Sequence, residues 1–107
     1  MQKRIYLLST FLPVLNFLFA TSALSAEADL VKAEKVYKRS CATCHGKQGE
    51  KPAMGESKII NQLKPEEIST ALSERKAGNI TGAGSPAKQR LSEQDIHNLS
   101  EYIQTLK

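Results

Sequence analysis

Residues 27–107 of the sequence predict an all-α domain with three main helices. Apolar side chains recur at spacings of three and four residues over 28–40, over 65–76 and in the segment that follows Ser92. The stretches between these segments are rich in glycine and proline, which interrupt regular structure. No βαβ pattern, internal repeat or low-complexity tract is found, so the domain is expected to consist of helices joined by loops.

The first expected helix, 28–40, leads directly into a cysteine. Leu30, Ala33 and Tyr37 mark its apolar face, and Cys41 continues that face at the next spacing of four residues. Lysine, arginine and glutamate side chains take the opposite face. The periodicity therefore predicts that this helix delivers the chain into Cys41.

The second expected helix, 65–76, has its own start and stop signals. It opens with a proline, which is tolerated at the first helical position, and two glutamates follow where the helix dipole favours acids. Gly78 lies just beyond its end and is a typical terminator. The segment 79–90 then contains two glycines, one proline and few apolar residues, which predicts a loop.

The last expected helix carries the clearest local signal in the chain. Ser92 is suited to be its N-cap, and Asp95 three residues later completes a capping box. Leu91 before the cap and Ile96 after it form the matching hydrophobic staple. The amphipathic stripe of this helix consists of Ile96, Leu99, Tyr102, Ile103 and Leu106.

Residues 1–26 have the layout of a secretory signal peptide. Two basic residues precede a largely apolar run over 5–20, and small residues follow it. The alternative is an uncleaved membrane anchor, but a proline and an asparagine interrupt the run. We therefore expect cleavage after Ser25 or Ala26, a periplasmic mature domain of residues 27–107, and no permanent membrane span.

The segment Cys41-Ala42-Thr43-Cys44-His45 has the pattern that is typical of covalent attachment of a c-type haem. The two thiols would form thioether links to the porphyrin, and the imidazole would ligate the iron. The alternatives are a redox dithiol and half of a zinc site. A zinc site needs two further ligands, and outside the motif the chain offers no cysteine and only His97. A thioredoxin-like dithiol needs a βαβ pattern. We therefore expect one haem c and its iron at Cys41, Cys44 and His45.

Together with Gly49 and the closing segment from Leu91 to Ile103, the motif resembles a small class I cytochrome c of the short bacterial type. The resemblance covers residues 27–107 and implies a cytochrome c-like fold of three main helices wrapped around one covalently attached haem. It implies that the first and last helices cross, with Tyr102 at the crossing. It also implies a single-electron carrier with one exposed haem edge.

The resemblance fails at the second axial ligand, because the loop 82–90 has no methionine. Met54 has the right chemistry but lies in a loop expected on the proximal side. Lys88 lies in the right loop and would have to lose its proton to bind. His97 is expected to face solvent. We therefore expect no side chain to hold the sixth position firmly. The alternative function is a haem-based module that binds or senses a small ligand at this open position.

The composition excludes some other functions. The net charge is +4, but basic residues are not interleaved with aromatic ones, so no binding to nucleic acid is expected. No acid–base or nucleophilic arrangement is present, so no enzymatic activity is expected. The expected partners are redox proteins. Lys47 and Lys51 flank the motif and would steer an acidic partner, although a solvated surface explains them equally well.

Overall fold

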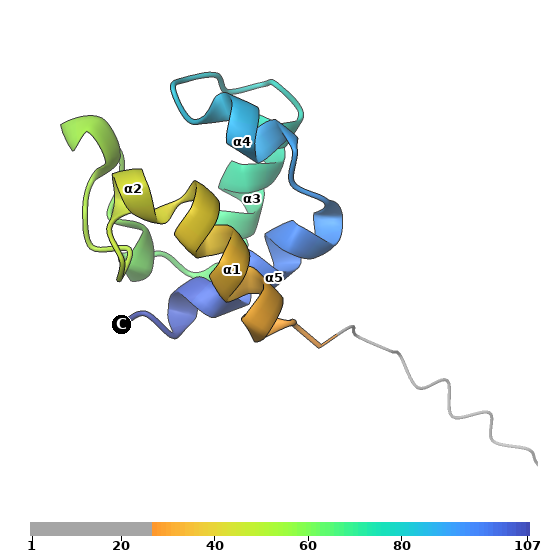
Figure 1. Cartoon of the computed structure of the whole chain (residues 1–107). Helices are drawn as coiled ribbons and strands as arrows, with labels where there is room; N and C mark the ends of the chain where they lie inside the picture. Colours follow the sequence, from red (N-terminus) through yellow and green to blue (C-terminus); the bar gives the residue numbers. More distant parts are fainter. Residues whose placement is uncertain (1–26) are drawn as a thin grey trace, which may run out of the picture.

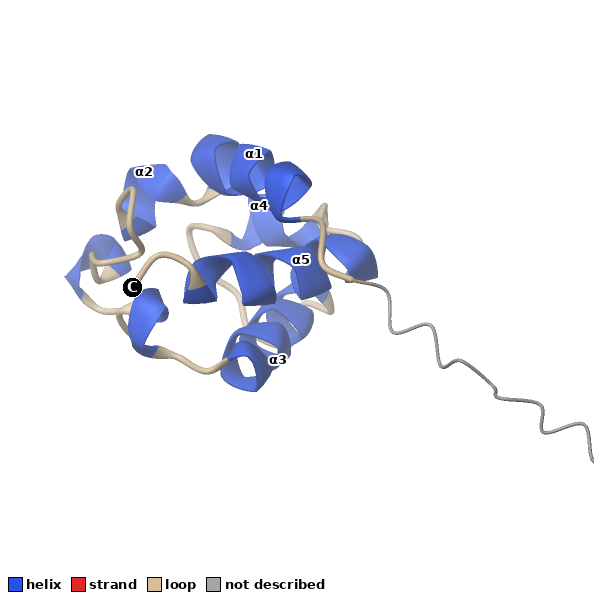
Figure 2. Ribbon diagram, turned by 90° about the horizontal axis from the view of Figure 1, so that it is seen from below, coloured by secondary structure: helices blue, strands red, loops and turns tan. Residues whose placement is uncertain are grey.

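The structure, a computed structural model, describes residues 27–107, and the expected signal peptide lies outside them. Figures 1 and 2 show that this part of the chain consists of helices and loops, without strands, which confirms the all-α class. Its helices are α1 (Leu30–Ser40), α2 (Ala42–His45), α3 (Pro65–Lys76), α4 (Ser85–Gln89) and α5 (Glu93–Gln104). Two single turns of 3-10 helix, η1 (Ala53–Gly55) and η2 (Ile60–Gln62), lie between α2 and α3.

The three long helices form the core of the domain. Helix α5 packs against both α1 and α3, and Figure 2 shows it between them. The expected apolar stripe of α5 faces this core, apart from the partly buried Tyr102. The buried apolar side chains are Ala33, Val36, Tyr37, Ile68, Leu91, Ile96, Leu99, Ile103 and Leu106.

Specific polar and aromatic contacts fix α1 against α5. The rings of Tyr37 and Tyr102 lie 5.6 Å apart between centroids, at an interplanar angle of 54°. The backbone N–H of Asp29 donates to Oδ1 of the fully buried Asn98 at 3.0 Å. The expected aromatic contact of Tyr102 at this helix pair is thus confirmed.

The capping signals in the sequence correctly predicted the limits of α3 and the start of α5. Helix α3 begins at Pro65 and ends before Gly78, which has a φ of +83°. At the start of α5, Ser92 Oγ accepts from the Asp95 N–H and the Asp95 carboxylate accepts from the Ser92 N–H, both at 3.0 Å. Leu91 and Ile96 are both buried, as expected for a staple.

Two expectations about the first helix were wrong. Helix α1 begins at Leu30, not at residue 28, because the Asp29 carboxylate accepts from the Lys32 N–H at 2.9 Å and acts as the N-cap. Leu30 was expected on the core face but is 42% exposed. It lies on an open surface beside His97 and Glu101.

The segment 79–90 is not entirely a loop, because it contains the short helix α4. The Gly82 N–H donates to Ser85 Oγ at 2.7 Å, and Pro86 occupies an early helical position where proline is tolerated. Helix α4 packs against α3, so a tertiary contact stabilises it. In residues 27–107, no helix has the length and apolar character needed to cross a membrane.

Candidate functional site

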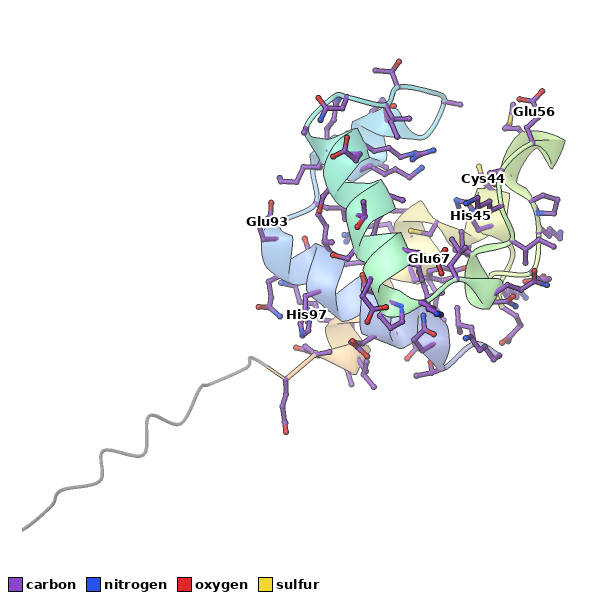
Figure 3. The ribbon with its side chains drawn as sticks, turned by 180° about the vertical axis from the view of Figure 1, so that it is seen from behind. Cys44, His45, Glu56, Glu67, Glu93 and His97 are labelled. Atoms are coloured by element: carbon purple, nitrogen blue, oxygen red, sulfur yellow. The ribbon has the colours of Figure 1, made fainter. Side chains whose placement is uncertain are left out.

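The five motif residues form one compact turn at the end of α1. The backbone N–H of Cys41 donates to the Tyr37 carbonyl at 2.8 Å, which continues the hydrogen bonding of α1. The N–H groups of Cys44 and His45 both donate to the Cys41 carbonyl, at 3.2 and 3.0 Å. Helix α2 and its N-cap Cys41 therefore present both thiols and the imidazole from a single helical turn, and Figure 3 shows Cys44 and His45 side by side.

The turn ends at Gly46, which has a φ of +84° that favours glycine. Tyr37 is fully buried, and its hydroxyl donates to the Gly46 carbonyl at 2.6 Å. Burial is the main cause that raises the pKa of Tyr37 to about 12. The Lys51 N–H donates to the His45 carbonyl at 3.0 Å. Backbone contacts on both sides of the motif thus hold His45 in place.

A cavity of about 510 Å³, the main cavity, lies beside this turn. Cys41 and His45 line one side of it. The remaining lining is largely apolar and comes mainly from α3, α5 and the segment that connects η1 to α3. Its apolar α3 and α5 members are Ile68, Ala71, Leu72, Leu99 and Ile103, and the charged Glu67 and Arg75 of α3 also line it. A volume of this size with a few polar groups is typical of a site for a cofactor.

A smaller space of about 80 Å³, the side cavity, adjoins the main cavity. It shares Cys41, His45 and Lys88 with the main cavity and adds Cys44 and Met54. The three predicted attachment residues therefore all line one continuous region of the surface. This region accommodates a flat apolar group that is attached to the protein along one edge.

The environment of His45 suits a metal ligand. Its side chain is half-buried, and burial, followed by the positive charges of Lys88 and Arg75, lowers its pKa. The imidazole is therefore held in the neutral form, which is the form that binds metals. Its Nδ1 atom is buried and has no hydrogen-bond partner, as expected where a bound group completes the polar contacts of the ring.

The two thiols differ in exposure. Cys41 is partly buried, and burial raises its pKa to about 11, whereas Cys44 is exposed. No disulfide joins them in the structure. One thiol therefore faces the apolar cavity while the other lies at its mouth, an arrangement that suits two attachment points along one edge of a haem. The residues present fit a covalently bound haem.

The three candidates for a second iron ligand differ in their position and exposure in the structure. Met54 lies on η1, is 76% exposed and lines the side cavity. Lys88 is half-buried and lines both cavities. Its pKa is lowered, mainly by burial and then by the charge of Arg75. His97 lies on the exposed side of α5, away from His45 (Figure 3), so it is not part of the site.

The apolar wall formed by α3 was only partly foreseen. The spacing of Ile68, Ala71, Leu72 and Arg75 indicated a common face, but periodicity alone does not distinguish a face that packs in a core from one that lines a cavity. Ala53 also lines the main cavity, and no local signal in the sequence pointed to it.

Comparisons with known proteins agree with this geometry. The family model described as cytochrome c matches residues 30–107. A cytochrome c-553 of Helicobacter pylori is 41% identical over 83 residues, which cover 77% of this chain and 86% of the relative. The cytochrome c-553 of a second strain is 40% identical over 74 residues, covering 68% and 77%. A cytochrome c-554(547) of Halothiobacillus neapolitanus is 36% identical over 91 residues, covering 74% and 98%.

Proposed function

The chain belongs to the cytochrome c family, and from that premise we propose that it is a periplasmic single-electron carrier whose haem c is held by Cys41, Cys44 and His45. Family membership implies the covalently bound haem c, its iron and the role of a haem-based electron carrier. The observation that carries the residue assignment is the position of the three side chains on one helical turn beside a largely apolar cavity.

When bound, the haem supplies an iron that changes between the ferrous and ferric states. The chain's own residues position it. Cys41 and Cys44 would each form one thioether, with the thiol hydrogen added to the neighbouring vinyl carbon. His45 would bind the iron through its neutral imidazole, and hydrogen bonds to Cys41 and Lys51 fix the backbone that carries this side chain. The apolar side chains of α3 and α5 would exclude water from the rest of the ring.

Partners of the carrier are redox proteins that approach the exposed side of the motif. Cys44 is exposed, and Lys47 and Lys51 beside it are exposed as well. Two exposed cations that closely follow the motif in the sequence would speed encounters with an acidic partner at low ionic strength. We expect electron transfer with such partners and no enzymatic turnover.

Expression with its leader in a bacterium that matures c-type cytochromes tests the proposal. The expected product is periplasmic, begins near Glu27, and has the mass of residues 27–107 plus one haem that survives denaturing electrophoresis. The double variant Cys41→Ala/Cys44→Ala should lose the covalent haem. His45→Ala should perturb the iron spectrum, whereas the matched control His97→Ala should not. Unmodified thiols in the mature wild-type protein would refute the assignment.

A second candidate function is a module that binds or senses small ligands, and one observation favours it. The segment 79–90, which includes α4, contains no methionine to fill the sixth iron position. A ferrous protein that binds carbon monoxide rapidly would support this function. A six-coordinate ferrous protein that is indifferent to carbon monoxide would support the electron carrier.

A further inference from the structure

We propose that the side-chain amine of Lys88 is the second protein ligand of the haem iron, so that His45 and Lys88 together complete its coordination. The assignment rests on the proposed function, because it requires a haem attached at Cys41 and Cys44. It concerns the coordination position for which the loop before α5 offers no methionine.

Lys88 and His45 reach the same space from different elements. His45 belongs to α2, which packs against α1 and η1, whereas Lys88 belongs to α4, which packs against α3. Figure 1 shows α2 and α4 well apart. Both side chains nevertheless line the main cavity and the side cavity. A group bound between these elements would therefore contact the imidazole of His45 from α2 and the amine of Lys88 from α4.

The backbone at Gly84 makes room for the amine to turn inward. Gly84 lies one helical turn before Lys88, and the Lys88 N–H donates to its carbonyl at 3.3 Å. Nζ of Lys88 lies 2.6 Å from the point where a Cβ on Gly84 would stand. Any larger residue at position 84 would therefore displace the amine. The side chain folds back over this glycine and is half-buried beside the cavity.

Lys88 forms no salt bridge within residues 27–107, although Glu56 and Glu67 line the same cavity. Burial, and after it the charge of Arg75, lowers the pKa of Lys88. A partly buried cation without a counter-ion is unfavourable. Binding to iron removes this cost, because the amine gives its proton to solvent and its lone pair forms the iron–nitrogen bond, without any change in oxidation state.

Met54 is a weaker candidate than Lys88 when the element that carries it and its exposure are compared. It lies on η1, which packs against α2, so it approaches from the element that carries His45. Its side chain is 76% exposed, whereas that of Lys88 is half-buried. A methionine in this position would cover the haem edge and would not need to bind the iron.

The test compares the haem-loaded mature protein with five variants: Lys88→Ala, Lys88→Arg, Lys58→Ala, Met54→Leu and Gly84→Ala. Lys88→Arg keeps the charge and the length, but a guanidinium does not lose its proton and cannot ligate. Lys58 is the matched control, because it is an exposed lysine that also lines the main cavity. Mass spectrometry reports haem attachment, electron paramagnetic resonance of the ferric form reports the spin state, and carbon monoxide binding to the ferrous form reports an open position.

We expect haem attachment in every protein. The wild type, Lys58→Ala and Met54→Leu should be low-spin and should bind carbon monoxide poorly. Lys88→Ala and Lys88→Arg should both lose the low-spin signal and bind carbon monoxide readily. Gly84→Ala should lose part of the low-spin signal, because the new methyl group displaces the amine.

Three results would overturn the assignment while leaving the proposed function intact: a high-spin wild type, a low-spin Lys88→Arg, or loss of the low-spin signal in Met54→Leu alone. Absence of covalent haem from the wild type would instead refute the proposed function, and this assignment with it.

Discussion

The hydrogen bond from Tyr37 to Gly46 is expected to contribute strongly to the stability of the turn that contains residues 41–45. Tyr37→Phe removes only the hydroxyl group. In the structure this hydroxyl donates to the Gly46 carbonyl at 2.6 Å from a ring that is fully buried, and the ring also contacts Tyr102. The substitution therefore keeps the packing and leaves the carbonyl that directly follows His45 without its side-chain partner.

The expected loss follows from leaving a buried acceptor unsatisfied, which costs about 1–3 kcal/mol of unfolding free energy. For a domain of this size, each kcal/mol lowers the melting temperature by about 4–8 °C. Tyr37→Phe should therefore melt roughly 4–24 °C below the wild type at neutral pH, with both proteins carrying haem.

The raised pKa of Tyr37 also makes the free energy of unfolding depend on pH, in a direction that can be worked out. Its pKa is about 12 in the folded protein, against the ordinary value of 10.0. As the pH rises from 10 towards 12, the unfolded chain loses the proton before the folded one, so alkali favours unfolding. The protonated Tyr37 contributes its full share of the unfolding free energy below pH 10. At most about 2.7 kcal/mol of this free energy is lost by pH 12, and the loss is smaller where solvent screens the phenolate. Phenylalanine has no such term, so the gap between the two proteins should narrow.

Chemical denaturation followed by circular dichroism at pH 8 and again near pH 11 measures both effects. Tyr102→Phe is the control, because it removes the hydroxyl of the other, partly exposed ring in the same pair. The reasoning fails if both variants lose equal stability at pH 8, or if the gap between wild type and Tyr37→Phe stays constant as the pH rises.

Three further substitutions can be followed by thermal unfolding of the haem-loaded protein. Leu99→Ala empties a core position that is 1% exposed and should cost about 2–5 kcal/mol; a cost below that of a surface substitution would contradict the described core. Ser92→Ala removes the oxygen that accepts from the Asp95 N–H and should cost about 1 kcal/mol, with no loss if α5 is held by packing alone. Gly46→Ala forces an L residue to a φ of +84° and should cost about 1–3 kcal/mol. Its new Cβ would also overlap the Glu50 carboxylate, so adding Glu50→Ala should recover part of the loss but not the backbone strain.

Local interactions explain what could be predicted well. The start of α5 depends on hydrogen bonds between Ser92 and Asp95, and the limits of α3 depend on Pro65 and Gly78, all within a few residues of the helix ends. Such signals act before any tertiary contact forms and can be recognised in the chain itself. The attachment motif belongs to the same group, since one helical turn is enough to bring two thiols and an imidazole together.

Tertiary packing explains the parts that were wrong or missing. Leu30 has the spacing of a core residue, but among residues 27–107 it lies on an open surface beside His97 and Glu101. Helix α4 is too short to be stable by itself, and its packing on α3 decides that it forms. The periodicity of α3 predicts an apolar face, but whether that face contacts another helix or lines a cavity depends on where α2 and α4 lie.

The sequence by itself therefore determined the all-α class and the long helices, and it predicts haem attachment at Cys41, Cys44 and His45, because each depends on neighbours within about one or two helical turns. Only the tertiary structure decided which side chains from distant segments meet around the cavity. It left Met54 exposed at the rim and brought Lys88 over Gly84 beside His45. The physical reason is that such contacts arise from the packing of α1, α3 and α5 as a whole, which no local pattern encodes.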